Sequence, residues 1–141
     1  MRRFLLSGLF LSMLGCVAPA ERVPLQPLPE NGQVLPYAEL LTRVRQQANG
    51  ANEAFYLDHW GELGDMAKGI EQTARFLAKA QEVPDKNKDI LTEITGDLAK
   101  AAKKLKAAAD AKNEKATRDA LQEINYKVRL LTTKIGDQPK E

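Results

Sequence analysis

Residues 58–84 read DHWGELGDMAKGIEQTARFLAKAQEVP, and the apolar residues in this stretch recur alternately three and four positions apart. That spacing predicts an α-helix that buries one apolar stripe, as helices do in coiled coils. We expect Asp58 to cap the start of this helix and Pro84 to lie beyond its end. The residues of the stripe are Trp60, Leu63, Ala67, Ile70, Ala74 and Leu77.

Three further segments repeat this helical pattern, one before the stretch and two after it. The first begins at Pro36, while Asp85 and Asn113 are expected to cap the third and fourth helices and Gly136 to end the last. Similar helices joined by short turns pack antiparallel, so the sequence predicts an all-α fold, an up-down-up-down four-helix bundle over residues 36–136. The expected core positions are Leu40, Val44, Ala48, Ala51 and Phe55; Leu91, Ile94, Leu98, Ala101, Leu105 and Ala108; and Ala120, Ile124, Val128, Leu131 and Ile135.

The first sixteen residues, MRRFLLSGLFLSMLGC, have the layout of a secretory signal peptide. Two arginines precede an apolar run of eleven residues, which is too short to span a bilayer. Residues 13–16 (MLGC) resemble the bacterial lipobox, in which the cysteine is acylated and the chain is cut before it. This resemblance implies lipid attachment, palmitate included, at Cys16. The alternative is an ordinary secretory peptide cut near Ala18 or Ala20.

Four regions follow from these signals. Residues 1–15 are expected to be the signal peptide and residues 16–35 a lipidated tether; five of the seven prolines lie between Cys16 and Pro36, with Pro36 included. Prolines at this spacing favour extended chain, so the tether should act as a semi-rigid spacer, although part of it can instead pack on the bundle as an arm. The bundle occupies residues 36–136, and residues 137–141 are expected to form a disordered tail.

Composition excludes several function classes. The chain has one Cys and one His, so it can form no internal disulfide and no Cys/His zinc cluster, and it lacks the parts of a catalytic triad. Removing residues 1–15 leaves 19 basic and 19 acidic residues, which gives no basic field for nucleic acid. We therefore expect a protein that is not an enzyme and that binds no metal, cofactor or nucleic acid.

Residues 37–135 resemble the superfamily of cytochrome c-prime and the periplasmic four-helix cytochromes b. The likeness rests on residues 59–63 (HWGEL), 98–102 (LAKAA) and 110–114 (DAKNE). The family attaches c-type haem through a Cys-x-x-Cys-His run on the last helix, or holds b-type haem between a Met on the first helix and a His on the last. Here residues 124–129 read INYKVR, with neither thiol nor imidazole. The resemblance thus implies a haem-less relative.

His59 and Met66 are the remaining haem-ligand candidates. They lie seven residues apart on one helix, so their Cα atoms are about 10.5 Å apart along its axis. Axial ligands approach iron from opposite faces of the macrocycle, which one straight helix cannot provide.

The most consistent function is a lipid-anchored, non-catalytic interaction or structural module in the bacterial cell envelope. The protein is expected to attach to the membrane through this lipid. Val17, after the cysteine, resembles the non-acidic residue that by default directs lipoproteins to the outer membrane, so the domain should face the periplasm. The alternative is an electron-transfer protein with haem or a small ligand in a core opened by Gly64, Ala67 and Gly96.

A partner surface is predicted from large apolar residues that fall outside the core stripes. Phe76 shares a second helix face with Gly69, Thr73 and Ala80, while Tyr126 and Leu130 lie one turn apart on the last helix. Either these residues cover the tether or they dock another chain, and we expect a homodimer contact through the Phe76 face.

Overall fold

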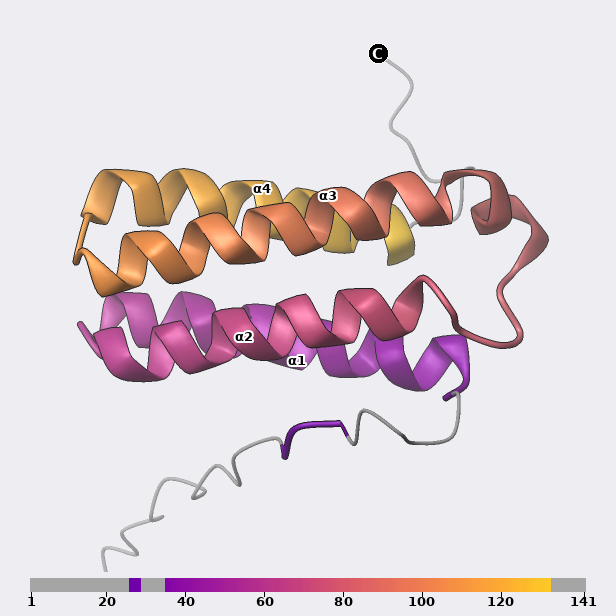
Figure 1. Ribbon diagram of the computed structural model, residues 1–141, viewed down its shortest axis with the longest axis horizontal. Helices are drawn as coiled ribbons and strands as arrows, with labels where there is room; N and C mark the ends of the chain where they lie inside the picture. The colour runs from indigo at the N-terminus through magenta and orange to yellow at the C-terminus, as the bar shows by residue number, and fades with distance from the viewer. Residues whose placement is uncertain (1–25, 29–34, 133–141) are drawn as a thin grey trace, which may run out of the picture.

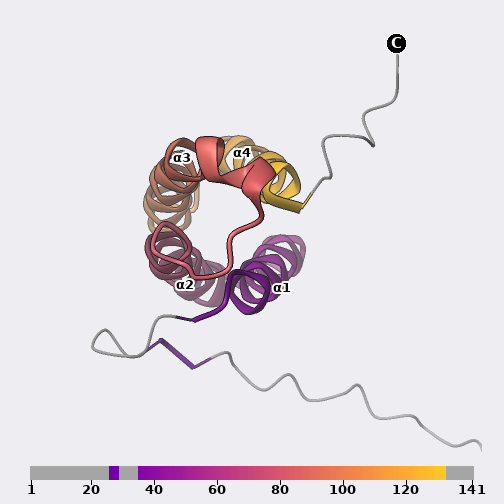
Figure 2. The ribbon, with the colours of Figure 1, turned by 90° about the vertical axis from the view of Figure 1, so that its right-hand side faces the viewer.

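The computed structural model describes residues 26–28 and 35–132 (Figure 1). Its four helices are α1 (Tyr37–Tyr56), α2 (Trp60–Leu77), α3 (Asp85–Asp110) and α4 (Glu114–Thr132). Each helix packs on the next in the chain, and α4 returns to α1. The end-on view shows the four helices in this cyclic order (Figure 2). The predicted all-α, up-down-up-down four-helix bundle is confirmed.

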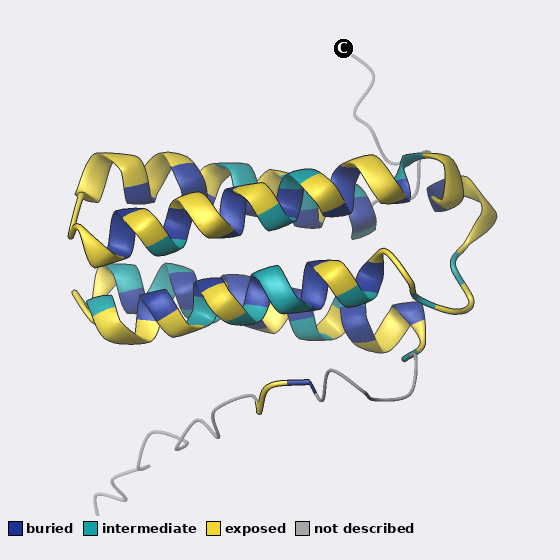
Figure 3. Ribbon diagram, viewed as in Figure 1, coloured by how far each residue is buried: buried dark blue, intermediate teal, exposed yellow. Residues whose placement is uncertain are grey.

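The core is built from the predicted apolar stripes, which face the bundle axis (Figure 3). All six predicted core positions of α3 are buried, and in α2 the whole stripe after Trp60 is buried. Phe55 and Trp60 are only partly buried, which corrects the prediction for these two positions. They flank the α1–α2 turn, where the bundle ends, and their rings pack edge to face with centroids 6.0 Å apart.

The helix ends match the predicted caps in one case out of three. Asn113 caps α4, because its Oδ1 accepts a hydrogen bond of 3.0 Å from the backbone N–H of Ala116. Asp85 is instead the first residue of α3, with Pro84 at the N-cap position. Asp58 does not cap α2 either, since it has a φ of 56° and belongs to the turn that ends α1.

The α1–α2 and α3–α4 turns share one Schellman geometry. At the end of α1, the N–H of His59 bonds to the carbonyl of Ala54 at 2.8 Å, with Asp58 in the left-handed region. At the end of α3, the N–H of Asn113 bonds to the carbonyl of Ala108 at 2.9 Å, with Lys112 at a φ of 49°. Neither turn uses the glycine that usually takes this position, so these tight turns were not visible as glycine signals.

The N-terminus of α1 is tied to the α2–α3 connection. The N–H of Tyr37 donates to the carbonyl of Gln81 at 2.9 Å, next to an isolated parallel bridge between Pro36 and Gln81. In the part of the chain that the structure describes, no helix is both long and apolar enough to cross a membrane. The predicted signal peptide, Cys16, Ile135, Gly136 and the tail lie outside the described residues.

Candidate functional site

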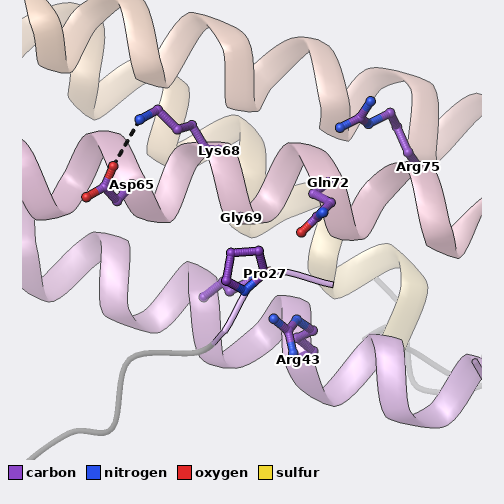
Figure 4. Close-up of a pocket in the computed structure, with 8 residues that line it drawn as sticks. Pro27, Arg43, Asp65, Lys68, Gly69, Gln72 and Arg75 are labelled. Carbon is purple, nitrogen blue, oxygen red and sulfur yellow. Dashed lines mark hydrogen bonds and ion pairs between the residues drawn. The ribbon is translucent and has the colours of Figure 1, made fainter. Parts of the chain in front are cut away.

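A groove between α1 and α2 holds a piece of the predicted tether, residues 26–28, which we call the strap (Figure 4). With the strap in place, an open space of about 490 Å³ remains beside it. Pro27 lies over Gly69 between the two helices, with Arg43 on the α1 side and Gln72 on the α2 side. The groove thus receives side chains from both helices and from the strap.

The floor of the groove is a buried polar pair. The Thr73 hydroxyl donates to Gln47 Oε1 at 2.9 Å, and both side chains are almost fully buried, at 0% and 2% exposure. A Cβ at position 69 would lie 2.8 Å from Gln47 Nε2. A larger residue at position 69 would therefore displace the Gln47 amide, which the buried hydrogen bond from Thr73 holds in place.

The strap is held through its backbone. The N–H of Leu28 donates to Gln72 Oε1 at 2.9 Å, and Gln72 Nε2 donates to the carbonyl of Leu28 at 2.7 Å. This two-way bond is what a neighbouring β-strand would offer to a residue in an antiparallel pair. The Leu28 side chain is buried, at 8% exposure, and joins the core cluster. One residue thus anchors the strap by both backbone and side chain.

Arg43 forms the polar wall of the groove on the α1 side. Its Nη2 donates to the carbonyl of Gln26. Its Nε is buried and has no hydrogen-bond partner among residues 26–28 and 35–132. Lys68 and Arg75 stand on the rim, and Lys68 pairs with Asp65 at 3.1 Å. Three cationic side chains and one carboxylate therefore line the groove.

A second buried polar cluster lies where α1 begins and α4 ends. The Tyr37 hydroxyl donates to the carbonyl of Leu131 at 2.8 Å and accepts from Asn87 Nδ2 at 2.9 Å. Burial raises the pKa of Tyr37, and the hydrogen bond from Asn87 opposes this shift. Asn87 Oδ1 is buried without a partner in the described part of the chain. This cluster joins α1, α3 and α4, and offers no nucleophile or base.

The predicted partner residues are dispersed in the structure. Phe76 is partly buried against the core, and Thr73, expected beside it on an outer face, instead packs inward against α1. Leu130 is also partly buried against the core. Tyr126 is 49% exposed, and the Arg129 guanidinium lies 5.7 Å from its ring centroid. Thr73 is thus not on an outer face, whereas the contact predicted at Phe76, Tyr126 and Leu130 and the expected homodimer stay predictions.

The haem-ligand candidates do not meet in the core. His59 precedes α2 with a side chain 57% exposed, and its Nδ1 lies 3.3 Å from Glu62 Oε2. The Met66 sulfur packs on Gly50, 3.3 Å from the position that a Cβ would occupy there. Among the described residues, no group of three or more His, Cys, Asp or Glu side chains could hold a metal ion.

The small residues that the alternative function needs are also separated. Gly64 is buried but faces the Lys106 side chain, with its ideal Cβ 3.5 Å from Lys106 Cδ. Gly96 is exposed, and nothing lies within 4 Å of its ideal Cβ. Of the three, only Ala67 lies in the apolar core.

No protein family, no curated protein and no solved structure matches the chain. The site is therefore defined by its geometry alone. Sequence reasoning missed Gln47, Arg43 and Gln72 as groove residues. The available signal was Leu28, an apolar residue that lies between two prolines in the predicted tether.

Proposed function

We propose that the chain is a lipid-anchored, non-catalytic module of the bacterial cell envelope, whose helical bundle faces the periplasm and binds a protein partner. The observation that carries this proposal is the sequence of residues 4–16, an apolar run that ends in Leu14, Gly15 and Cys16. Three acyl chains on one cysteine exceed the two hydrophobic signals that stable anchoring requires. Val17 favours delivery to the outer membrane.

The bundle supports the interaction part of the proposal. Its axis is filled by close-packed apolar side chains, among them Leu63, Ile70, Leu98 and Ile124, each at 0% exposure. Its surface carries the groove between α1 and α2, which already holds an extended peptide segment. Binding through this surface is therefore the chemistry for which the described residues are best arranged.

Mass spectrometry of the mature N-terminus tests the anchor. We expect cleavage before Cys16 and a mass increase from three acyl chains, which Cys16→Ser should abolish along with membrane fractionation. Ala18→Ser is the matched control: it alters an alternative cleavage position and keeps the cysteine, so acylation should persist. A mature chain that begins at residue 19 or 21 would refute the anchor.

We also infer that the bundle is a haem-less relative of the cytochrome c-prime superfamily. The four-helix bundle supports the relationship, and α4 (Glu114–Thr132) supplies neither a thiol nor an imidazole side chain as a haem ligand. Adding haemin to the purified protein should give only the Soret absorbance of free haemin. A shifted, saturable Soret band would favour the electron-transfer alternative.

A further inference from the structure

We propose that the α1–α2 groove is a docking site for an extended segment of a partner protein in which an acidic residue precedes a Pro-Leu pair. The chain's own strap, residues 26–28 (QPL), occupies this groove as a competitor that the partner displaces. The inference rests on the proposed function as an interaction module, but it does not depend on the lipid anchor.

The groove recognises peptide backbone. Gln72 uses both ends of its side-chain amide to pair with the N–H and carbonyl of a single residue, at 2.9 and 2.7 Å. Domains that bind extended peptides take their affinity from main-chain bonds of this kind and their specificity from side-chain pockets. The pocket here is the one that buries Leu28. Any extended segment with leucine at this position can make the same bonds.

The strap leaves a buried donor of Arg43 unused. Arg43 offers two adjacent N–H groups, on Nη2 and Nε, and only Nη2 reaches an acceptor in the described chain, the Gln26 carbonyl. A carboxylate accepts from both nitrogens in the fork geometry that guanidinium groups favour. Arg75 on the rim adds positive charge, whereas the charge of Lys68 is paired with Asp65. A carboxylate on the residue before the proline can therefore accept from Nε, which the Gln26 backbone carbonyl leaves without a partner in the described chain.

The strap fills the groove only in part. The strap is three residues long, and one buried side chain and three hydrogen bonds hold it. A space of about 490 Å³ remains open beside Pro27, toward Lys68 and Arg75. A longer segment from a partner can use this space as well as the strap's positions. The partner can bind only while the strap is out of the groove. Its apparent affinity is therefore its intrinsic affinity multiplied by the fraction of time for which the groove is free.

The test measures binding of two labelled peptides to the full chain by fluorescence anisotropy. One peptide is VPLQPLPE, the sequence of residues 23–30, and the other carries glutamate in place of its glutamine. Leu28→Asp in the chain removes the strap's apolar anchor and should raise the affinity for the glutamate peptide by about tenfold or more over wild type. The glutamate peptide should bind about tenfold more tightly than the glutamine peptide.

Three variants in the Leu28→Asp background identify the binding residues. Gln72→Ala should weaken both peptides at least tenfold, whereas Gln122→Ala, a matched change of an exposed glutamine on α4, should change neither. Arg43→Lys keeps the charge but loses the fork, so it should remove the preference for glutamate. Unchanged far-ultraviolet circular dichroism verifies that each variant stays folded.

A second measurement in the intact chain needs no added peptide. Gln26→Glu should bind the strap more tightly and so slow hydrogen exchange at the Leu28 amide relative to wild type. Gln72→Ala should make the same exchange faster. Failure of the folded Leu28→Asp chain to bind either peptide would overturn the proposal. So would sedimentation showing that the groove is filled by the strap of a second copy. Neither result would affect acylation at Cys16, so the proposed anchor is judged separately.

Discussion

Removing one oxygen atom from Tyr37 should weaken the end of the bundle where α1, α3 and α4 meet. Tyr37→Phe deletes a hydroxyl that donates to the Leu131 carbonyl at 2.8 Å and accepts from Asn87 Nδ2 at 2.9 Å. The ring stays in place, so the change leaves the apolar packing of the 4%-exposed side chain intact. What is lost is the satisfaction of two buried polar groups.

The expected loss in the free energy of unfolding depends on the hydrogen bonds that Asn87 keeps in the Tyr37→Phe variant. Without the hydroxyl, Asn87 Nδ2 keeps only a contact of 3.3 Å with the Leu131 carbonyl, and Asn87 Oδ1 already has no partner in the described chain. Leaving buried donors or acceptors poorly satisfied costs about 1–3 kcal/mol of the free energy of unfolding. For a domain of this size, each kcal/mol lowers Tm by roughly 4–8 °C.

Urea unfolding followed by circular dichroism measures this change, and an unaltered m-value would show that the unfolded state is not involved. The control is Tyr56→Phe. Because Tyr56 is 82% exposed, this variant should have the same free energy of unfolding as the wild type. Adding Asn87→Leu to Tyr37→Phe replaces both partners by apolar groups and should recover part of the loss. A loss below about 0.5 kcal/mol for Tyr37→Phe would refute the assigned role of the cluster.

Two further outcomes follow from the same structure. Because burial raises the pKa of Tyr37 above its usual value of 10.0, its hydroxyl contributes full stability below pH 10 and loses it as pH rises through the folded-state pKa. The difference in unfolding free energy between wild type and Tyr37→Phe should therefore shrink when urea unfolding is measured above about pH 10; a difference that grows there would contradict the assigned shift. Lys112→Gly should raise the free energy of unfolding by about 0.5–1 kcal/mol, because the left-handed φ of 49° strains a residue with a Cβ. Thermal unfolding checks this against Ala111→Gly, which has a right-handed conformation and should lower Tm.

The fold was predictable because each helix carries its own signal. Core positions three and four residues apart specify one stripe per helix, and four stripes of similar length have a bundle as their natural solution. Leu63, Ile70 and Leu77 illustrate the strength of this signal, since all three are fully buried as expected. The errors lie at Phe55 and Trp60, because a periodic pattern does not show where the partner helices stop covering the stripe.

Helix ends were less predictable for a related reason. Asp58 and Asp85 are residue types that cap helices, but whether they do so depends on the backbone angles around them. The Schellman turn at the end of α1 places Asp58 in the left-handed region, and the N-cap position then falls on His59. Asn113 follows the corresponding turn of α3 by one residue, which places it where its side chain can cap α4.

The groove depends on contacts between residues far apart in sequence, so no local pattern could reveal it. Leu28 and Gln72 are 44 positions apart, and Gln47 and Thr73 are 26 apart. On a helical wheel Gln47 and Thr73 read as polar residues near the edge of a stripe, where an exposed position is the usual expectation. Only the closeness of α1 and α2 at Gly69 makes them a buried pair.

The same pair explains how the groove keeps its shape. An apolar contact between two helices tolerates a shift along their axes, because one methyl group can replace another. A buried hydroxyl bonded to a buried amide at 2.9 Å does not, since a shift of one turn would leave both groups without partners. Gly69 allows the two helices to approach this closely, because a Cβ there would lie only 2.8 Å from Gln47 Nε2. The relative register of α1 and α2 is thereby fixed directly beneath the strap, so that Arg43 from one helix and Gln72 from the other stand at a set spacing. Two side chains that must bind adjacent peptide groups of one extended segment require such a fixed spacing, and this links the buried polar floor to the binding chemistry above it.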